Sequence, residues 1–227
     1  MYTPPAFRVD RSTSLEFASS HGFGLVCAFD AHKPIASPLP FDIAYGSDGT
    51  PYVSFHVARG NLLAACAGGQ NSWLLTVNGP HAYVSPHWYA SGDQVPTWLY
   101  QTVHLTGPAR IMSGEELVEN LQCLSAKFEA GLAPKPAWTI AELSAGRREM
   151  LLKAITGIVM TVESVEGTFK LNQTKSEADH VAIASALIQQ HDEAAQATGK
   201  QMVALRPQLE YKSTIPVSAP ADVRNVP

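Results

Sequence analysis

Charged residues are scarce in this sequence, and no basic cluster is present. Lys, Arg, Asp and Glu make up 16% of the 227 residues, and the formal net charge is −4. Proteins that bind nucleic acid usually carry a basic face, whereas the longest basic run here is Arg147-Arg148. The composition therefore disfavours direct DNA binding.

Long apolar runs and paired cysteines are also missing. No stretch approaches the roughly 20 apolar residues that cross a bilayer, and residues 1–5 lack the pattern of a secretion signal. Cys27, Cys66 and Cys123 are far apart and form no Cys-x-x-Cys pair. We therefore expect reduced thiols in a cytoplasmic protein that has no membrane partner.

Familiar motifs of nucleotide binding and hydrolysis are absent. The sequence has no Gly-x-Gly-x-x-Gly, no Gly-x-x-x-x-Gly-Lys-Ser/Thr, no Gly-x-Ser-x-Gly and no His-Glu-x-x-His. His81, His87 and His104 could meet on neighbouring strands, but no carboxylate or thiol accompanies them at the spacing of metal ligands. We predict no metal site, and no residue stands as a nucleophile beside its base.

Short apolar segments separated by turn residues fill the first half of the chain. Asp48-Gly49 and Asn78-Gly79-Pro80 are typical of turns, because Asp-Gly and Asn-Gly readily adopt positive φ. The predicted strands are 23–29, 35–44, 51–58, 72–78, 81–88 and 98–111. Six strands without long helices between them predict an antiparallel barrel or sandwich.

Capping signals and apolar periodicity predict helices at the N-terminus and in the second half. Thr13-Ser14-Leu15-Glu16 and Ser113-Gly114-Glu115-Glu116 have the form of capping boxes. The predicted helices are 10–20, 113–131, 139–156 and 176–198, with strands at 158–162 and 167–170. The fold class is therefore mainly β with added helices (α+β). We expect one domain over residues 1–200 and a Pro-rich C-terminal tail over 201–227.

One polar cluster stands at the end of a predicted strand. By alternation, Ser54, His56 and Ala58 share a face, and Arg59 and Asn61 follow in the turn. An arginine at this position can bind a phosphate bidentately, with neighbouring polar groups completing the site. The alternative is a surface arginine in an ordinary ion pair.

Two further segments could face a ligand. Residues 79–89 and 95–100 concentrate aromatic side chains and prolines, which suits either core and dimer contacts or a flat wall for a planar ligand such as a flavin. Lys170 and Gln173 follow a predicted strand and precede a predicted helix. They form either a solvated linker or a site in which Lys170 neutralises a phosphate and Gln173 hydrogen-bonds a polar ring edge.

Six short motifs follow one another over residues 1–190. They are Met1-Tyr2-x-Pro4-x-x-Phe7, His56-x-Ala58-Arg59-x-Asn61, Gly79-Pro80-x-x-Tyr83-Val84-Ser85-Pro86-x-Trp88-Tyr89, Val95-Pro96-Thr97-Trp98-x-Tyr100, Val103-His104 and Lys170-Leu171-x-Gln173. Together, in this order, they resemble the PaiB-type family of FMN-binding negative transcriptional regulators. The resemblance implies an antiparallel split β-barrel of the FMN-binding type, with FMN as cofactor, and a homodimer with the flavin site at the subunit interface.

The resemblance also implies which residues hold FMN. Two cations and a histidine would hold the phosphate, three polar side chains would add hydrogen bonds, and two aromatic rings would form an apolar wall. The phosphate residues would be Arg59, Lys170 and His56. The polar side chains would be Asn61, Thr97 and Gln173, and the rings would be Trp98 and Tyr100. Ala58 belongs to the same motif as His56, Arg59 and Asn61.

The sequence departs from the family's pattern at several positions. Leu62-Leu63 stand where a proline and an aromatic residue are usual, and Leu99 stands where an asparagine is usual; Pro38-Leu39-Pro40 and Thr174-Lys175 also differ. We expect an FMN-binding protein, which could be a flavin-dependent oxidoreductase or a flavin reductase. The alternatives are a transcriptional regulator acting through a partner or DNA, and a degenerate dimeric barrel that binds another small ligand such as haem.

Overall fold

The protein divides into two compact units. The computed structural model describes residues 1–30, 32–69, 71–132 and 134–211. Unit 1 comprises residues 1–2, 8–78 and 102–168. Unit 2 comprises residues 3–7, 79–101 and those from 169 onward.

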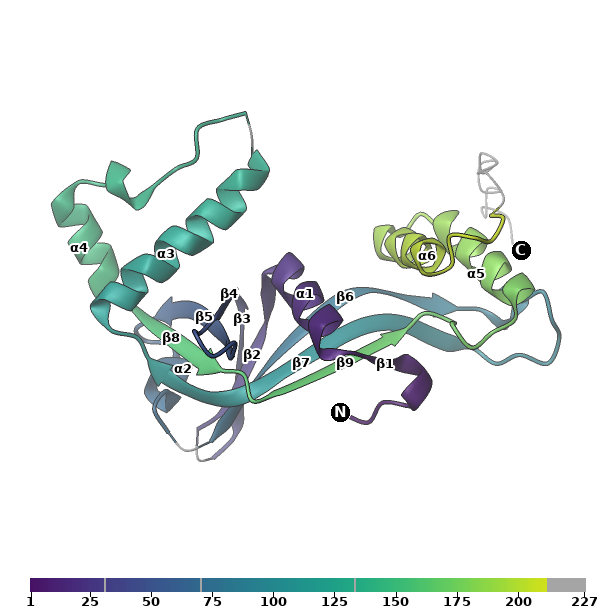
Figure 1. Ribbon diagram of the computed structural model, residues 1–227, viewed down its shortest axis with the longest axis horizontal. Coiled ribbons are helices and arrows are strands. Elements are labelled where there is room, and N and C mark those ends of the chain that lie inside the picture. The colour runs from purple at the N-terminus through teal and green to yellow at the C-terminus, as the bar shows by residue number, and fades with distance from the viewer. Residues whose placement is uncertain (31, 70, 133, 212–227) are drawn as a thin grey trace, which may run out of the picture. The chain divides into compact units, whose positions relative to one another are not determined.

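Strands dominate the first half of the chain and helices the second (Figure 1). The strands are β1 (Arg8–Val9), β2 (Phe23–Phe29), β3 (Pro34–Pro40), β4 (Asp42–Tyr45), β5 (Pro51–Ala58), β6 (Ser72–Val84), β7 (Thr97–Ile111), β8 (Ile155–Thr161) and β9 (Ser164–Lys170). The α-helices are α1 (Arg11–His21), α2 (Leu62–Cys66), α3 (Gly114–Glu129), α4 (Ala145–Lys153), α5 (Glu177–Ile188) and α6 (Glu193–Leu205). Short 3-10 helices are η1 (Pro5–Phe7), η2 (Pro86–Trp88), η3 (Ala130–Leu132) and η4 (Ile140–Glu142).

The strands form one antiparallel sheet. Its order is β3-β2-β6-β7-β8-β5-β4, and β9 pairs with both β1 and β7. β2 pairs with β3 along its whole length, and a tight turn joins β4 to β5. Gly49, in this turn, has φ +80°, as the Asp-Gly signal predicts. The predicted antiparallel β fold with added helices is confirmed.

Strict alternation along β5 separates the core of unit 1 from a polar face. Val53, Phe55 and Val57 are buried, whereas Ser54 and His56 point to the opposite side and are half-buried. α3 covers that side, because the Asn120 side chain donates a hydrogen bond to the Ser54 hydroxyl at 2.8 Å. The predicted shared face of this strand is therefore present.

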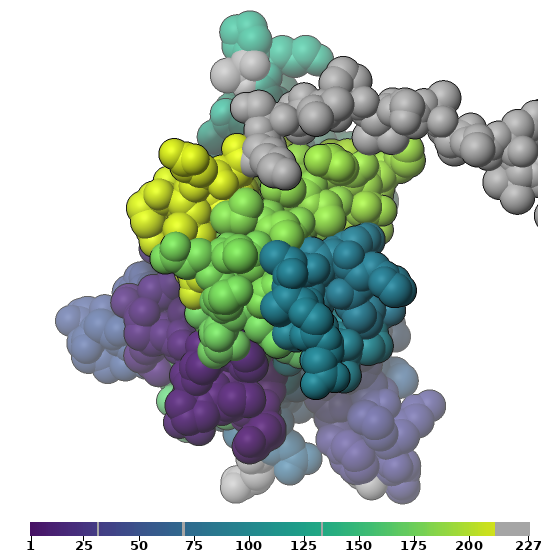
Figure 2. All heavy atoms as spheres, turned by 90° about the vertical axis from the view of Figure 1, so that its right-hand side faces the viewer, coloured from purple at the N-terminus to yellow at the C-terminus, as the bar shows by residue number. Residues whose placement is uncertain are grey.

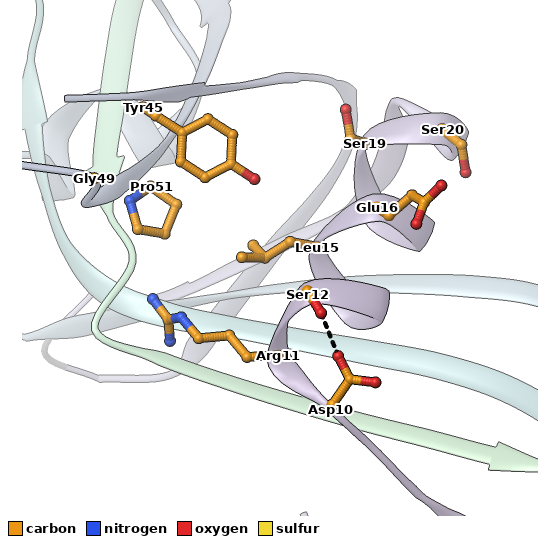
Figure 3. Close-up of a pocket in the computed structure, with 10 residues that line it drawn as sticks. All are labelled: Asp10, Arg11, Ser12, Leu15, Glu16, Ser19, Ser20, Tyr45, Gly49 and Pro51. Carbon is orange, nitrogen blue, oxygen red and sulfur yellow. Dashed lines mark hydrogen bonds between the residues drawn. The ribbon is translucent and has the colours of Figure 1, made fainter. Parts of the chain in front are cut away.

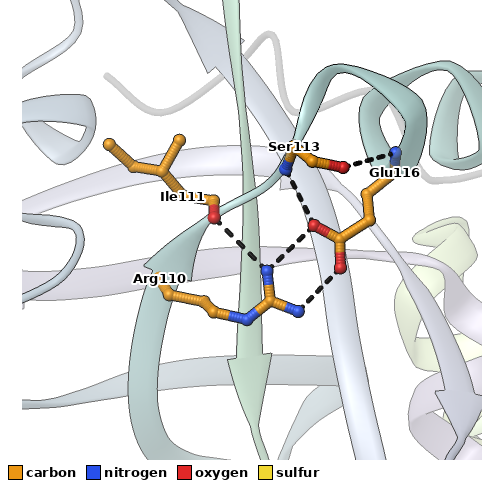
Figure 4. Close-up of polar contacts among 4 residues, drawn as sticks. All are labelled: Arg110, Ile111, Ser113 and Glu116. Carbon is orange, nitrogen blue, oxygen red and sulfur yellow. Dashed lines mark hydrogen bonds and ion pairs between the residues drawn. The ribbon is translucent and has the colours of Figure 1, made fainter.

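A double hydrogen bond fixes the start of α3 beside the end of β7 (Figure 4). The Ser113 hydroxyl accepts the Glu116 backbone N–H, and the Glu116 carboxylate accepts the Ser113 backbone N–H, so the predicted capping box is confirmed. The Arg110 guanidinium contacts both carboxylate oxygens of Glu116, at 2.7 and 2.9 Å. This contact and the Ser113 backbone N–H lower the pKa of Glu116 to about 2.

Unit 2 buries its own apolar cluster, between α5, α6 and its parts of β6 and β7. The members share near-complete burial and are Ala82, Val84, Leu99, Leu171, Ile183, Ala184, Leu187, Ala195 and Met202. Figure 2 shows α5, in green, beside the blue-green connection between β6 and β7. Asp179 of α5 ties that connection down by accepting hydrogen bonds from the Ser91 backbone and hydroxyl at about 2.9–3.0 Å.

Tertiary contacts move several predicted strand boundaries. The predicted strand 35–44 breaks at Phe41, which is fully buried and donates its backbone N–H to the Gly22 carbonyl at 2.9 Å. Asn78-Gly79-Pro80 lies inside β6 instead of forming a turn, because Asn78 accepts a hydrogen bond from Thr102 of β7 at 2.6 Å. The predicted strand 81–88 therefore ends at Val84, and η2 follows.

The predicted helices change in three places. Asp10, and not Thr13, caps α1, because the Asp10 carboxylate accepts the Thr13 backbone N–H. The predicted helix 139–156 is η4 and α4, and its last residues belong to β8 because they pair with β5. The predicted helix 176–198 is two helices, since Asp192 caps α6.

The predicted division into residues 1–200 and 201–227 stays a prediction. α6 continues to Leu205, so the first residues of the predicted tail are helical. Tyr211 donates its hydroxyl to the Arg206 carbonyl at 3.0 Å. Residues 212–227 lie outside the described residues.

Candidate functional site

The nine predicted site residues are distributed over both units. His56 and Ala58 lie on β5, and Arg59 and Asn61 lie in the turn that leads to α2, all in unit 1. The other five belong to unit 2 and are Thr97, Trp98 and Tyr100 on β7, Lys170 at the end of β9, and Gln173 just beyond it.

Arg59 is held by backbone carbonyls at the end of α4. Its Nε donates to the Lys153 carbonyl at 2.7 Å, and one terminal nitrogen lies 3.4 Å from the Ile155 carbonyl. Among the described residues it forms no ion pair. The alternative interpretation of Arg59, a surface arginine in an ordinary ion pair, is therefore not seen in this part of the chain. Arg59 also lines a cavity of about 390 Å³. A guanidinium has five N–H donors, so the contacts to Lys153 and Ile155 leave donors for an anion.

Asn61 has a structural role as the N-cap of α2. Its Oδ1 accepts the Leu63 backbone N–H at 2.9 Å, and its Nδ2 donates to the Ser37 hydroxyl at 3.0 Å. Leu63, one of the departures from the family pattern, is fully buried, whereas Leu62 is exposed. Hydrogen bonds within unit 1 therefore engage both polar atoms of Asn61.

His56 is half-buried beneath α3 and next to Asn120. Burial lowers its pKa, and the neighbouring Asn120 side chain partly offsets that effect. Nδ1 of His56 and Oδ1 of Asn120 have no hydrogen-bond partner among the described residues. His56 is thus neutral at pH 7, and Ala58 beside it offers only a methyl group. The sequence signal for Asn120 is a polar residue within the apolar stripe of Leu117, Leu121 and Leu124.

Lys170 and Thr97 meet in unit 2 although 73 residues separate them in the chain. The Lys170 Nζ donates to the Thr97 hydroxyl at 2.7 Å. Both side chains are half-buried. A neutral hydroxyl leaves the charge of the ammonium uncompensated, so this pair can receive an anionic group.

Aromatic rings gather on the exposed side of β6 and β7 in the same unit. We call His81, Tyr83, Trp98 and Tyr100 the aromatic surface. The Trp98 ring centroid lies 5.6 Å from that of His81 and 6.1 Å from that of Tyr83. Trp98 is 53% exposed and Tyr83 is 47% exposed. The aromatic surface can therefore take a planar ligand.

Leu99 faces away from the aromatic surface. It is fully buried in the apolar cluster of unit 2, because neighbouring residues of a strand point to opposite sides. The replacement of the family's usual asparagine therefore removes no polar group from the side on which Trp98 and Tyr100 stand.

Gln173 holds segments of unit 2 together. Its Oε1 accepts the Leu171 backbone N–H at 2.7 Å, and its Nε2 donates to the carbonyls of Ala6, at 3.1 Å, and Phe169. Its side-chain nitrogen and oxygen are both engaged. A contact between Gln173 and a ring edge would replace one of these hydrogen bonds.

These residues of unit 2 fit the two ends of FMN. A flavin needs a flat apolar contact for its ring system and a cation or hydrogen-bond donors for its phosphate. Trp98 and Tyr100 are exposed or half-exposed rings, and Lys170 is an ammonium whose contact with Thr97 leaves its charge uncompensated. The chemistry of these groups suits a phosphorylated flavin, and alternation along β7 places Thr97 on the Leu99 side of the strand and the two rings on the other side.

Another cavity of unit 1, of about 870 Å³, lies between α1 and the turn that joins β4 to β5 (Figure 3). None of the nine predicted site residues lines it. Of its two acidic residues, Asp10 and Glu16, the first is already engaged as a helix cap, with hydrogen bonds from Ser12 and Thr13. The cavity has no arrangement that points to a particular ligand.

No group of three or more His, Cys, Asp or Glu side chains in the described ranges could hold a metal ion. No described helix has both the length and the apolar character needed to cross a bilayer.

The family is established by comparison with known sequences. The model of the family described as "Putative FMN-binding domain" matches residues 1–164. The chain therefore belongs to this FMN-binding family, and the predictions of the family and of FMN as cofactor are confirmed. The curated "Protease synthase and sporulation protein PAI 2" of Bacillus subtilis is 34% identical over 184 residues, which cover 81% of this chain and 87% of that protein. The chain is PaiB-like.

Solved structures support the fold. The FAD and heme binding protein of Mycobacterium smegmatis matches with a TM-score of 0.53 and 16% identity, over 96% of this chain and 92% of that one. The flavocytochrome Anf3 of Azotobacter vinelandii matches with a TM-score of 0.50 and 16% identity, over 96% of this chain and 86% of that one. With the antiparallel sheet, these matches confirm the α+β split barrel.

Proposed function

We propose that this FMN-binding chain receives the flavin ring on its aromatic surface, holds the phosphate with Lys170, and acts as a homodimer. The observation that carries the proposal is the 2.7 Å contact between Lys170 and Thr97 in the unit that also bears Trp98. Alternation along β7 puts Thr97 on the side of Leu99 and Trp98 on the other, so the flavin would pass around the start of β7, with its phosphate at Lys170 and its ring on the aromatic surface. Bound FMN supplies electron-transfer chemistry, and the residues of the chain bind and orient it.

Lys170 is the residue we assign to the phosphate. A phosphate oxygen is a stronger acceptor for an ammonium than the Thr97 hydroxyl is, because that hydrogen bond joins two charged groups. Thr97 can then donate its own hydroxyl to the same phosphate. Arg59, in unit 1, is a separate prediction that is tested by itself, and neutral His56 adds no charge.

An exposed apolar face of the sheet in unit 1 supports the homodimer. Phe23, Leu25 and Phe29 point outward from β2 and are 55%, 38% and 48% exposed. They lie opposite Pro40, Pro38 and Pro34 of β3 in the strand register. Leu74 of β6 lies opposite Cys27 on the same face. Contiguous apolar surface of this kind usually marks an interaction site.

The composition of β3 favours face-to-face packing over strand addition. β3 stands at the end of the strand order and contains three prolines, Pro34, Pro38 and Pro40. Proline has no N–H to donate to a further strand. A second copy of the chain would therefore cover the β2 face and would not extend the sheet, which gives the homodimer a contact without charged groups.

Fluorescence titration of FMN, and of riboflavin, which lacks the phosphate, tests the role of Lys170. Lys170→Met should weaken FMN binding about 10- to 100-fold, the value of a hydrogen bond between charged groups. It should leave riboflavin binding nearly unchanged. Lys175→Met is the matched control, because Lys175 contacts Gln94 and the Tyr89 ring instead.

Several outcomes contradict the proposal. No FMN binding at tens of micromolar would contradict it as a whole. Equal loss of FMN and riboflavin in Lys170→Met would place the lysine away from the phosphate. Trp98→Leu should weaken both ligands alike, and unchanged binding would remove the aromatic surface from the site. Unchanged FMN affinity in Arg59→Ala would remove Arg59 from the phosphate.

Sedimentation measures the homodimer directly. The native chain should sediment as a dimer at micromolar concentration, and Phe29→Glu should shift it to monomer by burying a charge in the apolar face. Arg11→Glu, on exposed α1, is the control for an added acidic group. A native monomer would contradict the proposed dimer without affecting the assignment of Lys170.

A regulatory role and a cytoplasmic location can each be tested separately from FMN binding. The name of the Bacillus relative connects that protein to protease synthesis and sporulation, and a regulatory role for this chain stays a prediction. Nanomolar binding to specific DNA in a gel shift at physiological salt would support it. The three thiols, which are not in disulfides among the described residues, support a cytoplasmic location, which fractionation would test.

A further inference from the structure

An apolar cavity of about 210 Å³ lies in unit 1, beside the helices drawn as α3 and α4 in Figure 1. Leu121 of α3 forms one wall, Trp138 and Leu143 of the connection form another, and Leu152 of α4 a third. Ile155, at the start of β8, also lines it. None of the predicted FMN-binding residues lines this cavity, so it is separate from the proposed flavin site.

Arg148 is the only charged residue that lines the cavity. Its side chain makes no hydrogen bond or ion pair in the described part of the chain. The nearest carboxylate along the helix, Glu149, is already engaged by Lys153 at 2.7 Å. A solvent-exposed guanidinium without a protein partner therefore stands at the edge of an apolar cavity. That combination favours a ligand with an anionic end and an apolar body.

Apolar side chains at the cavity are left partly exposed. Trp138 and Leu151 are each 40% exposed. Both would lose contact with water if the cavity were filled, which is favourable at about 25 cal/mol per Å² of apolar area. At ~30 Å³ for each water-sized group, the volume holds roughly seven such groups. This is the size of a medium-length alkyl chain or of one aromatic ring with a short substituent.

We propose that this cavity binds a small amphipathic carboxylate, with its chain or ring among the apolar residues and its carboxylate on Arg148. The carboxylate accepts two hydrogen bonds from the guanidinium, a geometry that arginine provides and lysine does not. A phosphate would also pair with Arg148, but its larger hydration cost and the absence of other charged side chains in the lining favour the carboxylate.

Titration calorimetry with octanoate and with 1-octanol tests the proposal. Octanoate should bind the native chain at one site per chain, and 1-octanol should bind at least about tenfold more weakly because it cannot pair with Arg148. Arg148→Gln should weaken octanoate at least about tenfold and leave 1-octanol unchanged. Arg147→Gln is the matched control, because Arg147 neighbours Arg148 on α4 but does not line the cavity.

A second variant tests the apolar wall. Leu143→Ser should weaken octanoate and 1-octanol by the same factor, because both lose the same contact. Equal affinity of octanoate for the native chain and for Arg148→Gln would overturn the proposal. Acetate binding as tightly as octanoate would overturn it as well, since it would show an anion at the surface only. Octanoate affinity that falls as protein concentration rises would show that a second copy fills the cavity.

Discussion

One buried or half-buried histidine in each unit differs from the other in the hydrogen bonds of its ring nitrogens. In unit 2, His180 is fully buried, and its ring nitrogens lie 3.0 Å from the Met202 carbonyl and 3.4 Å from the Asn172 carbonyl. In unit 1, His56 is half-buried, and its Nδ1 has no partner in the described ranges. Both ring nitrogens of His180 lie near backbone carbonyls, whereas Nδ1 of His56 has no hydrogen-bond partner among the described residues.

The two units also differ in what covers their apolar residues. Unit 2 encloses Leu99, Ile183 and Leu187 between its own helices and strands. Unit 1 leaves Phe23 and Phe29 of β2 exposed. Unit 2 encloses an apolar cluster but leaves Tyr83 and Trp98 of the aromatic surface exposed, whereas the exposed apolar face of unit 1 lies on β2. The proposed dimer face and the cavity of the proposed carboxylate site both lie in unit 1.

The largest effect should come from the tightest contact within unit 1. An added Cβ at Gly107 of β7 would overlap the Thr161 carbonyl. We expect Gly107→Ala to lower the free energy of unfolding by at least about 3 kcal/mol, because two backbone segments must separate. Thermal unfolding measures it, with Gly114→Ala as the control, since nothing lies within 4 Å of an added Cβ there. Equal stability of the two variants would show that this contact does not limit packing.

The buried carboxylate of unit 2 should have the next largest effect. Burial would raise the pKa of Asp179, but hydrogen bonds from Ser91 and Ser176 outweigh it and lower the pKa. Its stabilisation is therefore present above the ordinary pKa of about 4 and is lost as pH falls through the lowered value. Asp179→Asn should cost about 2 kcal/mol at pH 7, and the difference should shrink below about pH 4. Exposed Glu177→Gln should change urea unfolding little.

The same exchange of glycine for alanine, made at one helix position in each unit, should change stability in opposite directions. An added Cβ at Gly199 of α6 would lie 3.0 Å from the Ala184 carbonyl of α5, so Gly199→Ala should destabilise unit 2 by about 1–2 kcal/mol. At Gly146 of α4 nothing lies within 4 Å, and Gly146→Ala should stabilise by up to about 1 kcal/mol. Melting temperatures that move in the same direction would contradict this difference in packing.

His56 should give the smallest effect, as a slope of stability against pH. Its pKa is lowered in the folded state, so the unfolded chain binds more protons below the ordinary pKa of about 6.5. Stability should therefore fall as pH drops from 7 to 5.5, and His56→Gln should reduce that fall by up to about 1 kcal/mol. Exposed His87→Gln is the control. The same slope in both variants would mean that α3 does not bury His56.

Local patterns predicted the elements whose contacts are close in sequence. The Asp48-Gly49 turn and the capping box at Ser113 are present because each depends on residues within a few positions. Asn78-Gly79-Pro80 failed as a turn because Thr102 of β7 holds Asn78 in an extended strand. At the candidate site, the sequence indicated Lys170 and Thr97 as separate candidates. It could not indicate that the polar side-chain atoms of Asn61 and Gln173 form hydrogen bonds within the fold.

The sequence alone determined the family, the FMN cofactor and the antiparallel class of the fold, because motif order, alternation and turn residues are properties of the chain itself. Only the tertiary structure decided which polar groups remain available to a ligand and which apolar faces remain uncovered. Leu99 makes the difference plain, since its substitution looked like a lost site residue and its side chain lies in the core. Hydrogen bonds and burial depend on contacts between distant segments, which no local pattern records.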